Sequence, residues 1–226
     1  MNAVDFHSDI AQAFGDRYQQ SADFKERYRV WTSLLDQYAK PGQRVLDAGC
    51  GTGVFSLYLA NRGCQVTAID GSAEMIRICR QQPAPMIPVD FSEGLLPLDS
   101  TTVTGPFSLI LSSSVLEYVP DLVGTLQSLT DQLRPGGYLI VSLPNQQSIY
   151  RRLERLSYRL SNKPAYLNHV LHYSTANNLT NTLKENTLVL LKSQTYGGTN
   201  AYARLLRTCL PASFADTLFV AVFQKY

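Results

Sequence analysis

Residues 45–53 read Val-Leu-Asp-Ala-Gly-Cys-Gly-Thr-Gly, an apolar run that ends in three glycines at alternate positions. The pattern predicts a buried strand at 43–46, a tight turn at 49–53 and a helix at 54–61. Glycines let the backbone approach a ligand closely, and a helix N-terminus offers unpaired N–H groups to it. A second predicted strand, 65–69, ends in Asp70, 19 residues beyond Gly51. In a βαβ unit, an acid at this distance binds a ribose diol.

The spacing of the glycines distinguishes two kinds of nucleotide-binding turn. A dinucleotide fingerprint needs a small last residue in G-x-G-x-x-G/A, and this chain has Val54 or Ser56 there. The D-x-G-x-G-x-G pattern from Asp47 instead resembles motif I of the class I S-adenosylmethionine-dependent methyltransferases. The resemblance implies that an acid and the glycine backbone hold the amino-acid end of the cofactor, here at Asp47, Gly49, Gly51 and Gly53. The alternative is a glycine turn that only joins a strand to a helix.

Three further segments follow the order of this family. Residues 72–75 read Ser-Ala-Glu-Met, which resembles the family's S-x-x-M helix start, with the methionine near the adenine. Asp90 and Phe91 follow a short predicted strand at 86–89 and match the family's adenine clamp, although an acid at a strand end is usually a cap. A fourth strand is predicted at 107–114. The resemblance therefore adds to the cofactor set Asp70, Gly71, Ser72, Met75, Asp90, Phe91, Ser112 and Ser113.

Residues 1–40 are predicted to form two helices with aromatic residues at helical spacing, the first through Phe6, Ile10, Phe14 and Tyr18. An aromatic face packed on the sheet edge explains most of them. In related methyltransferases such a segment also covers the cofactor, which makes Tyr18, Arg27 and Arg29 candidate contacts. Arg29 matches a cofactor-contacting arginine of the ubiquinone-biosynthesis O-methyltransferases, and a solvated arginine is the alternative.

Residues 144–172 form an insertion that usually becomes a substrate lid in this fold. An apolar stripe through Ile149, Leu153, Leu156 and Leu160 is flanked by four arginines. These arginines could pair with a substrate carboxylate or phosphate, contact an anionic membrane surface, or form a solvated basic face. The substrate contacts expected here are Tyr150, Arg152, Tyr166 and Tyr173.

An oxygen acceptor would need a base, for which a neutral histidine is the usual choice. His172 matches a position near the pocket in several relatives and is preferred over His169; a histidine that caps the following helix is the alternative. In the ubiquinone-biosynthesis enzymes, two glutamates and a histidine form a metal site. Those ligands fall on Ser114, Glu117 and Tyr118 here. A serine and a phenol are poor ligands for a divalent ion, so we expect catalysis without a metal.

Composition and charge restrict the class of protein further. The chain has 226 residues, of which 45% are hydrophobic and 17% charged, and a formal net charge of +2. The length fits one domain with a sizeable core, and so small a charge gives no electrostatic reason to expect nucleic acid. Residues 112–115, Ser-Ser-Ser-Val, also lack the Pro-Pro-aromatic pattern of nucleic-acid amino-methyltransferases.

No apolar run approaches the roughly 18–20 residues that cross a bilayer. The first residues lack the basic and apolar regions of a secretory signal. The four cysteines are far apart, as in proteins that keep their thiols reduced. We therefore expect a cytoplasmic protein.

The alternation of strands and helices predicts one doubly wound, Rossmann-like α/β domain over 1–226. Its parts are a helical cap (1–40), a cofactor-binding core (41–143), a lid (144–172) and the C-terminal part of the sheet (173–226). The resemblance implies a seven-stranded sheet with an antiparallel last strand, and transfer of a methyl group from S-adenosylmethionine to an oxygen or nitrogen of a small molecule, such as an anionic or natural-product acceptor. The alternatives are a cofactor-binding protein without methyl transfer, and a protein or RNA methyltransferase of the same fold.

Overall fold

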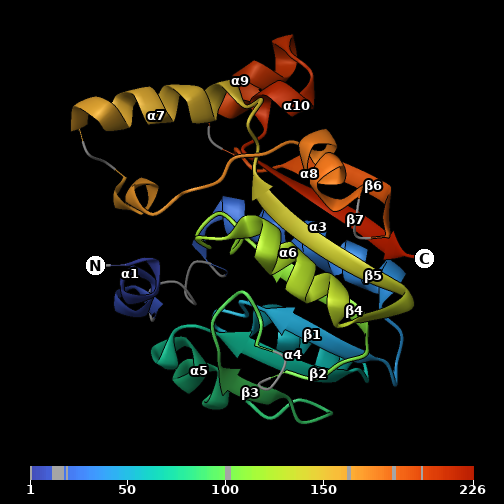
Figure 1. Ribbon diagram of the computed structural model, residues 1–226. Coiled ribbons are helices and arrows are strands. Elements are labelled where there is room, and N and C mark those ends of the chain that lie inside the picture. Colours follow the sequence, from blue (N-terminus) through green and yellow to red (C-terminus); the bar gives the residue numbers. More distant parts are fainter. Residues whose placement is uncertain are drawn as a thin grey trace.

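The computed structural model describes residues 2–11, 18, 20–99, 103–161, 164–184, 187–199 and 201–226. Within them, seven strands form one sheet in the order β3-β2-β1-β4-β5-β7-β6 (Figure 1). The strands are β1 (Arg44–Ala48), β2 (Gln65–Asp70), β3 (Asp90–Glu93), β4 (Phe107–Ser113), β5 (Leu133–Pro144), β6 (Leu188–Tyr196) and β7 (Leu218–Lys225). β7 runs antiparallel to both of its neighbours, and β1 to β5 are parallel. The expected seven-stranded sheet with an antiparallel last strand is confirmed.

Helices cover both faces of the sheet (Figure 1). They are α1 (Ala3–Asp9), α3 (Ala22–Tyr38), α4 (Val54–Asn61), α5 (Ala73–Arg80), α6 (Leu122–Asp131), α7 (Ile149–Ser161), the 3₁₀ helix η1 (Ala165–Asn168), α8 (Ala176–Leu183), α9 (Ala201–Cys209) and α10 (Ala212–Ala215). Successive side chains of a strand point to opposite faces. On β1, Val45 packs in a cluster with α3 and α4, whereas Leu46 packs with α6 and α8. Covering on both faces explains why the parallel strands read as continuous apolar runs.

The turn before β5 differs from its expected form. The residues Arg-Pro-Gly-Gly at 134–137 are typical of a turn ahead of a strand at 138–143, whereas β5 already begins at Leu133. Leu133 pairs with Phe107, and the register then shifts before Leu109 pairs with Tyr138. The two glycines are therefore an irregularity within a longer strand, where Gly136 adopts a φ of +73°.

Some expected features fall outside the described residues. Phe14 of the first predicted helix belongs to this group. None of the helices in the described ranges is both long and apolar enough to cross a membrane.

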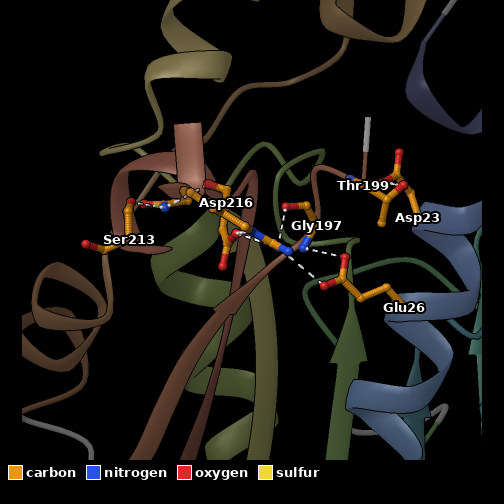
Figure 2. Close-up of polar contacts among 8 residues, drawn as sticks. Asp23, Glu26, Gly197, Thr199, Ser213 and Asp216 are labelled. Atoms are coloured by element: carbon orange, nitrogen blue, oxygen red, sulfur yellow. Dashed lines mark hydrogen bonds and ion pairs between the residues drawn. The ribbon is translucent and has the colours of Figure 1, made fainter. Parts of the chain in front are cut away.

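One arginine ties the N-terminal half of α3 to the end of the chain. The Arg207 guanidinium on α9 donates to Asp216 at 2.7 Å, to Glu26 of α3 at 3.3 Å and to the carbonyl oxygen of Gly197 at 3.2 Å. The Gly197 N–H donates to Glu26 in turn. Figure 2 shows Glu26, Gly197 and Asp216 converging on this point. The side chain of Asp216 is only 3% exposed, so its charge depends on this partner.

Replacing Arg207 by Met should therefore lower the free energy of unfolding by about 1–3 kcal/mol, because a buried carboxylate loses its charged donor. Arg204→Met, on an exposed position of the same helix, is the matched control and should change stability by less than about 0.5 kcal/mol. Urea unfolding measures both. Equal stabilities of the two variants would show that the Arg207 contacts contribute nothing.

Candidate functional site

A cavity of about 550 Å³ lies at the carboxyl ends of β1, β2 and β4. This is the edge where open α/β sheets bind ligands, and the size is within the range of about 300–1,000 Å³ for small-molecule sites. Its walls come from α1, α3, the glycine turn, the loop after β4 and the α7–η1 lid. The contributing residues fall in the segments 3–10, 18–27, 47–55, 70–75, 94–96, 113–120, 151 and 164–166, with Leu218.

The Asp70 carboxylate, at the end of β2, lines the cavity. One oxygen accepts from the backbone N–H of Gly51 at 2.8 Å, and the other accepts from that of Ser72 at 2.9 Å. Burial raises the pKa of Asp70 above its usual value, although both backbone bonds oppose the rise. Each carboxylate oxygen keeps a further lone pair that can accept from a ligand hydroxyl.

The first glycine of the turn is required by close packing. Gly49 has a φ of +81°, and a Cβ there would lie 2.3 Å from a methyl carbon of Val115. No other residue fits at this position without displacing the loop after β4. Gly49 and Gly51 line the cavity as expected, whereas Gly53 stands at the N-cap of α4 and does not.

Asp47 lies buried beneath the turn and lines the cavity. It accepts a hydrogen bond of 2.5 Å from the Ser56 hydroxyl of α4. Burial raises its pKa from 3.8 to about 7, against the opposing effect of the Ser56 bond. A carboxylate with this pKa exchanges its proton near neutral pH.

Of the two α3 arginines that are candidate cofactor contacts from the sequence, Arg27 lines the cavity and Arg29 does not, so the placement of Arg29 does not support its position in the cofactor set. The Arg27 guanidinium is buried and donates to the carbonyl oxygen of Ser113 at 2.6 Å and to its hydroxyl at 2.9 Å. Arg29 is exposed and contacts the carbonyl oxygen of Lys25. Side chains two positions apart on a helix do not share a face, so Arg27 and Arg29 point in different directions. The signal that distinguishes Arg27 from Arg29 is that Arg27 precedes buried Trp31 and Leu34 by four and seven positions, on the same stripe.

Other expected cofactor contacts divide into lining and supporting residues. Ser72 is buried behind the wall, where its hydroxyl caps α5 by accepting from the Met75 N–H and contacts Ser8. Ser112 is buried within β4 and also does not line the cavity. The expected residues that do line it, besides those above, are Tyr18, Gly71, Met75 and Ser113.

The residues expected to form the adenine clamp, Asp90 and Phe91, lie away from the cavity lining. The reason is that β3 begins at Asp90, where the predicted strand at 86–89 has already ended. Asp90 is the first residue of β3, is exposed and pairs with Thr67. The carboxyl end of β3 is Glu93, opposite Asp70. Neither Asp90 nor Phe91 lines the cavity, and residues 94–96 do so instead.

A second acid, Glu117, enters the cavity from the loop after β4. Its side chain is 3% exposed, and within the described part of the chain its Oε2 atom has no hydrogen-bond partner. Burial raises its pKa from 4.5 to about 7, although its own backbone N–H and the Arg27 and Arg151 guanidinium groups lower it in part. Beside it lies Tyr118, whose phenol pKa is raised by burial and whose ring meets the His7 ring edge to face at 4.8 Å.

The lid contributes Arg151 of α7 and Tyr166 of η1, both of which line the cavity. Arg151 donates to Glu154 at 2.7 Å and also to the Tyr166 hydroxyl, which in turn donates to Glu154 at 2.6 Å. Its Nε donates to the carbonyl oxygen of Thr217. The expected contact at Tyr166 therefore lies at the cavity. Arg152, by contrast, is exposed on the next position of the helix.

The remaining predicted substrate and catalytic residues lie outside the cavity lining. Tyr150 does not line it, and Tyr173 lies beneath the Arg155 guanidinium at 4.6 Å. His172 Nε2 lies 2.8 Å from the carbonyl oxygen of Val119, so this nitrogen carries the hydrogen and donates it. His169 packs against the Phe6 ring at 5.0 Å. The placement of the two histidines does not support either as the base, and the histidine that lines the cavity is His7 of α1.

The residues that replace the relatives' metal ligands do not form a cluster of that kind. Among the described residues, no three His, Cys, Asp or Glu side chains gather as a metal ion would require. Ser114 adopts a φ of +57°, and its backbone N–H donates to the Ser142 hydroxyl.

Comparison with known proteins places this cavity in a family. A model of the methyltransferase domain matches residues 21–193, which is most of the chain. The chain belongs to the methyltransferase domain family. This family uses S-adenosylmethionine as its methyl donor, so the family and the cofactor expected from the sequence are confirmed.

Two relatives share about a third of the matched residues. One is the malonyl-[acyl-carrier protein] O-methyltransferase of Enterobacter lignolyticus, 34% identical over 155 residues, or 64% of this chain and 59% of the relative. The other is the ubiquinone biosynthesis O-methyltransferase of Xanthomonas campestris, 35% identical over 109 residues, or 48% and 46%. The matches therefore span about half of the length of these relatives.

Solved structures show the same fold at low sequence identity. The N-methyltransferase NodS of Bradyrhizobium japonicum, in complex with S-adenosylhomocysteine, has a TM-score of 0.69 at 18% identity, covering 100% of this chain and 99% of that one. A methyltransferase of Haloferax volcanii in complex with the activator Trm112 has a TM-score of 0.69 at 14% identity, covering 96% of each.

Asp47 should make stability depend on pH. Its folded-state pKa, about 7, lies above the unfolded value of about 3.9, so its contribution is fully present below about pH 4 and is lost as the pH rises through about 7. Asp47→Asn, whose amide oxygen can still accept from Ser56, should remove this loss, of at most about 1.4 kcal/mol per pH unit. Urea unfolding of both proteins at pH 5 and pH 8 measures it. If the difference in unfolding free energy between the wild type and Asp47→Asn is the same at pH 5 and at pH 8, the raised pKa of Asp47 is contradicted.

Proposed function

We propose that this chain transfers a methyl group from S-adenosylmethionine to an oxygen or nitrogen of a small molecule, without a metal ion. The observation that carries the proposal is a single cavity lined by two sets of residues. One set is the glycine turn with Asp70, and the other is the buried Glu117 with Tyr118 beside it in sequence. The cofactor supplies the methyl group on a positively charged sulfur, which is a good leaving group, so the protein mainly has to align and deprotonate the acceptor.

The residues present fit the cofactor. Gly49 and Gly51 expose backbone to the cavity, and Gly49 allows the turn to pack directly on Val115. We assign the ribose hydroxyls to the free lone pairs of Asp70, and the amino group of the methionine part to Asp47. Arg27 takes the role that the sequence gives to Arg29, because its guanidinium is the one that faces the cavity and can pair with a carboxylate. The adenine would lie beside Met75 and residues 94–96.

The acceptor is the less defined partner. Both relatives above carry O-methyltransferase in their names, one for a malonyl-acyl-carrier protein and one for ubiquinone biosynthesis, which favours an oxygen acceptor. For an anionic acceptor, Arg151 is the lid arginine that lines the cavity among the described residues, and Glu154 already balances its charge. Contact of the other lid arginines with an anionic membrane surface stays a prediction, as do the absence of a nucleic-acid partner and the cytoplasmic location.

Asp70→Ala should weaken S-adenosylmethionine binding by about 2–3 kcal/mol, the scale for losing a charged hydrogen-bond partner. Asp90→Ala is the matched control, because the exposed Asp90 does not line the cavity. Calorimetric titration of the folded variants gives both affinities. Unchanged affinity for Asp70→Ala would remove this residue from the site, and weakened affinity for Asp90→Ala would restore the adenine clamp expected from the sequence.

Methyl transfer itself is tested by release of S-adenosylhomocysteine in the presence of candidate acceptors, with excess EDTA and then with added magnesium. We expect release that depends on an acceptor and equal rates in both conditions, because Ser114 and Tyr118 are poor ligands for a divalent ion. Binding of the cofactor with no release for any acceptor would favour the alternative of a binding protein. Activity that EDTA abolishes and magnesium restores would contradict the metal-free mechanism.

A further inference from the structure

The backbone around Glu117 is held so that its side chain enters the cavity. The Glu117 carbonyl oxygen accepts from the backbone N–H groups of Leu171 at 2.7 Å and His172 at 3.3 Å. Tyr118 N–H donates to the carbonyl oxygen of Val115, which closes the turn. The loop is thus fixed from the segment that follows η1, and the carboxylate lines the cavity although it is almost completely buried.

The charge of Glu117 has electrostatic support but its Oε2 atom has no hydrogen bond among the described residues. The two guanidinium groups that favour the charge are bonded to other groups: Arg27 donates to Ser113, and Arg151 donates to Glu154 and to the Thr217 carbonyl oxygen. A buried carboxylate oxygen with no donor is costly to a fold. A position that keeps such a group in a cavity wall suggests that a ligand supplies the missing donor.

The chemistry of the ligand group follows from that of Glu117. A carboxylate oxygen only accepts hydrogen bonds, so the group that meets it must carry a hydrogen on oxygen or nitrogen. Aromatic rings line the same cavity, among them Phe6 and His7 from α1, Tyr118 from the same loop and Tyr166 from η1. A flat acceptor with a hydroxyl or amino group at its edge fits such walls.

We propose that Glu117 Oε2 binds the hydrogen of the acceptor's nucleophilic hydroxyl or amino group and takes that proton during methyl transfer. This assignment rests on the proposed function and gives the role of base to Glu117 in place of His172. The acceptor's lone pair forms the bond to the methyl carbon as the carbon–sulfur bond breaks, and the breaking pair stays on sulfur. The acceptor's proton goes to Glu117. The sulfonium charge and the Glu117 carboxylate charge disappear together, so the transfer leaves the net charge of the cavity unchanged.

The protonation behaviour of Glu117 suits this role. With a pKa of about 7, the group is partly ionised at neutral pH and still holds a proton well once it has taken one. The charged and titratable groups that interact with it are Arg27 from α3, Arg151 from α7, and the phenols of Tyr118, Tyr173 and Tyr196. His7 of α1 and Tyr166 of η1 line the same cavity.

The proposal is tested with two probes that differ in one hydrogen-bond donor, phenol and anisole. Each is titrated by saturation-transfer NMR into the wild-type protein bound to S-adenosylhomocysteine. Because a hydrogen bond to a charged group is worth about a factor of ten or more, phenol should bind at least about tenfold tighter than anisole. Glu117→Met, which has no comparable acceptor, should bind the two within about threefold. Glu117→Gln should keep part of the preference, since its amide oxygen still accepts.

Glu117→Gln also separates binding from proton transfer. For any acceptor that the wild type methylates, this variant should lower kcat by about a hundredfold or more, with a much smaller change in KM, because the amide cannot take the proton. Glu74→Gln, the same substitution on an exposed position of α5, is the matched control and should change neither constant. Both Glu117 variants should unfold at a temperature no lower than the wild type, since each removes a buried carboxylate.

Equal binding of phenol and anisole by the wild type would overturn the proposal, as would a full preference for phenol in Glu117→Met. Unchanged kcat in Glu117→Gln would overturn the proton-transfer step. These failures are distinct from failure of the proposed function, which would appear as no binding of S-adenosylhomocysteine to the wild type. In that case the two probes are compared on the free protein, and the same outcomes decide whether Glu117 binds a donor.

Discussion

The cavity depends on one carboxylate at the end of β2. Asp70 accepts from the N–H groups of Gly51 and Ser72 and so connects the glycine turn with the start of α5. The backbone N–H groups of Gly49 and Cys50 donate to the carbonyl oxygen of Ile69, the residue just before it. The end of β2 therefore holds in place both the glycine turn after β1 and the start of α5. These two segments border the carboxyl edge of the sheet, where open α/β sheets bind ligands.

The site combines acids that are costly to bury. Burial raises the pKa of Asp47, Asp70 and Glu117, and all three line the same cavity. Arg27 and Arg151 supply the nearby positive charge, although each is bonded to other groups. Perturbed carboxyl groups gathered in a cleft are characteristic of functional sites. Asp47 is held by the hydrogen bond from the Ser56 hydroxyl. The Oε2 atom of Glu117 has no such donor among the described residues, and in our proposal the acceptor supplies it.

Local patterns allowed the fold and half of the site to be predicted. The strand–glycine–helix pattern around Asp47 and the acid at the end of the second strand depend on neighbours in sequence, and both lie where expected. Predictions failed where the answer required the phase of a helix or the start of a strand. Arg29 lies two residues after Arg27, and Arg152 lies one residue after Arg151; in both pairs only the earlier arginine faces the cavity. Asp90 begins a strand that the sequence predicts it to follow. The position of Glu117 in the cavity wall depends on hydrogen bonds from the backbone of residues 171–172. These residues are more than fifty positions away in sequence, so no local pattern predicts the contact.

The link between Arg207 and Glu26 has a consequence for how the protein is made. Glu26 precedes Arg27 on α3, and its partners are Gly197 and Arg207, near the far end of the chain. A ribosome that has released the first five strands has already produced the glycine turn and Asp70. At that stage α3 can already pack on β1 and α4, and Arg27 can already bond to Ser113, but Glu26 still lacks Gly197 and Arg207. The contacts of the residue next to Arg27 in the cavity wall can therefore form only after residues 197–207 have been made.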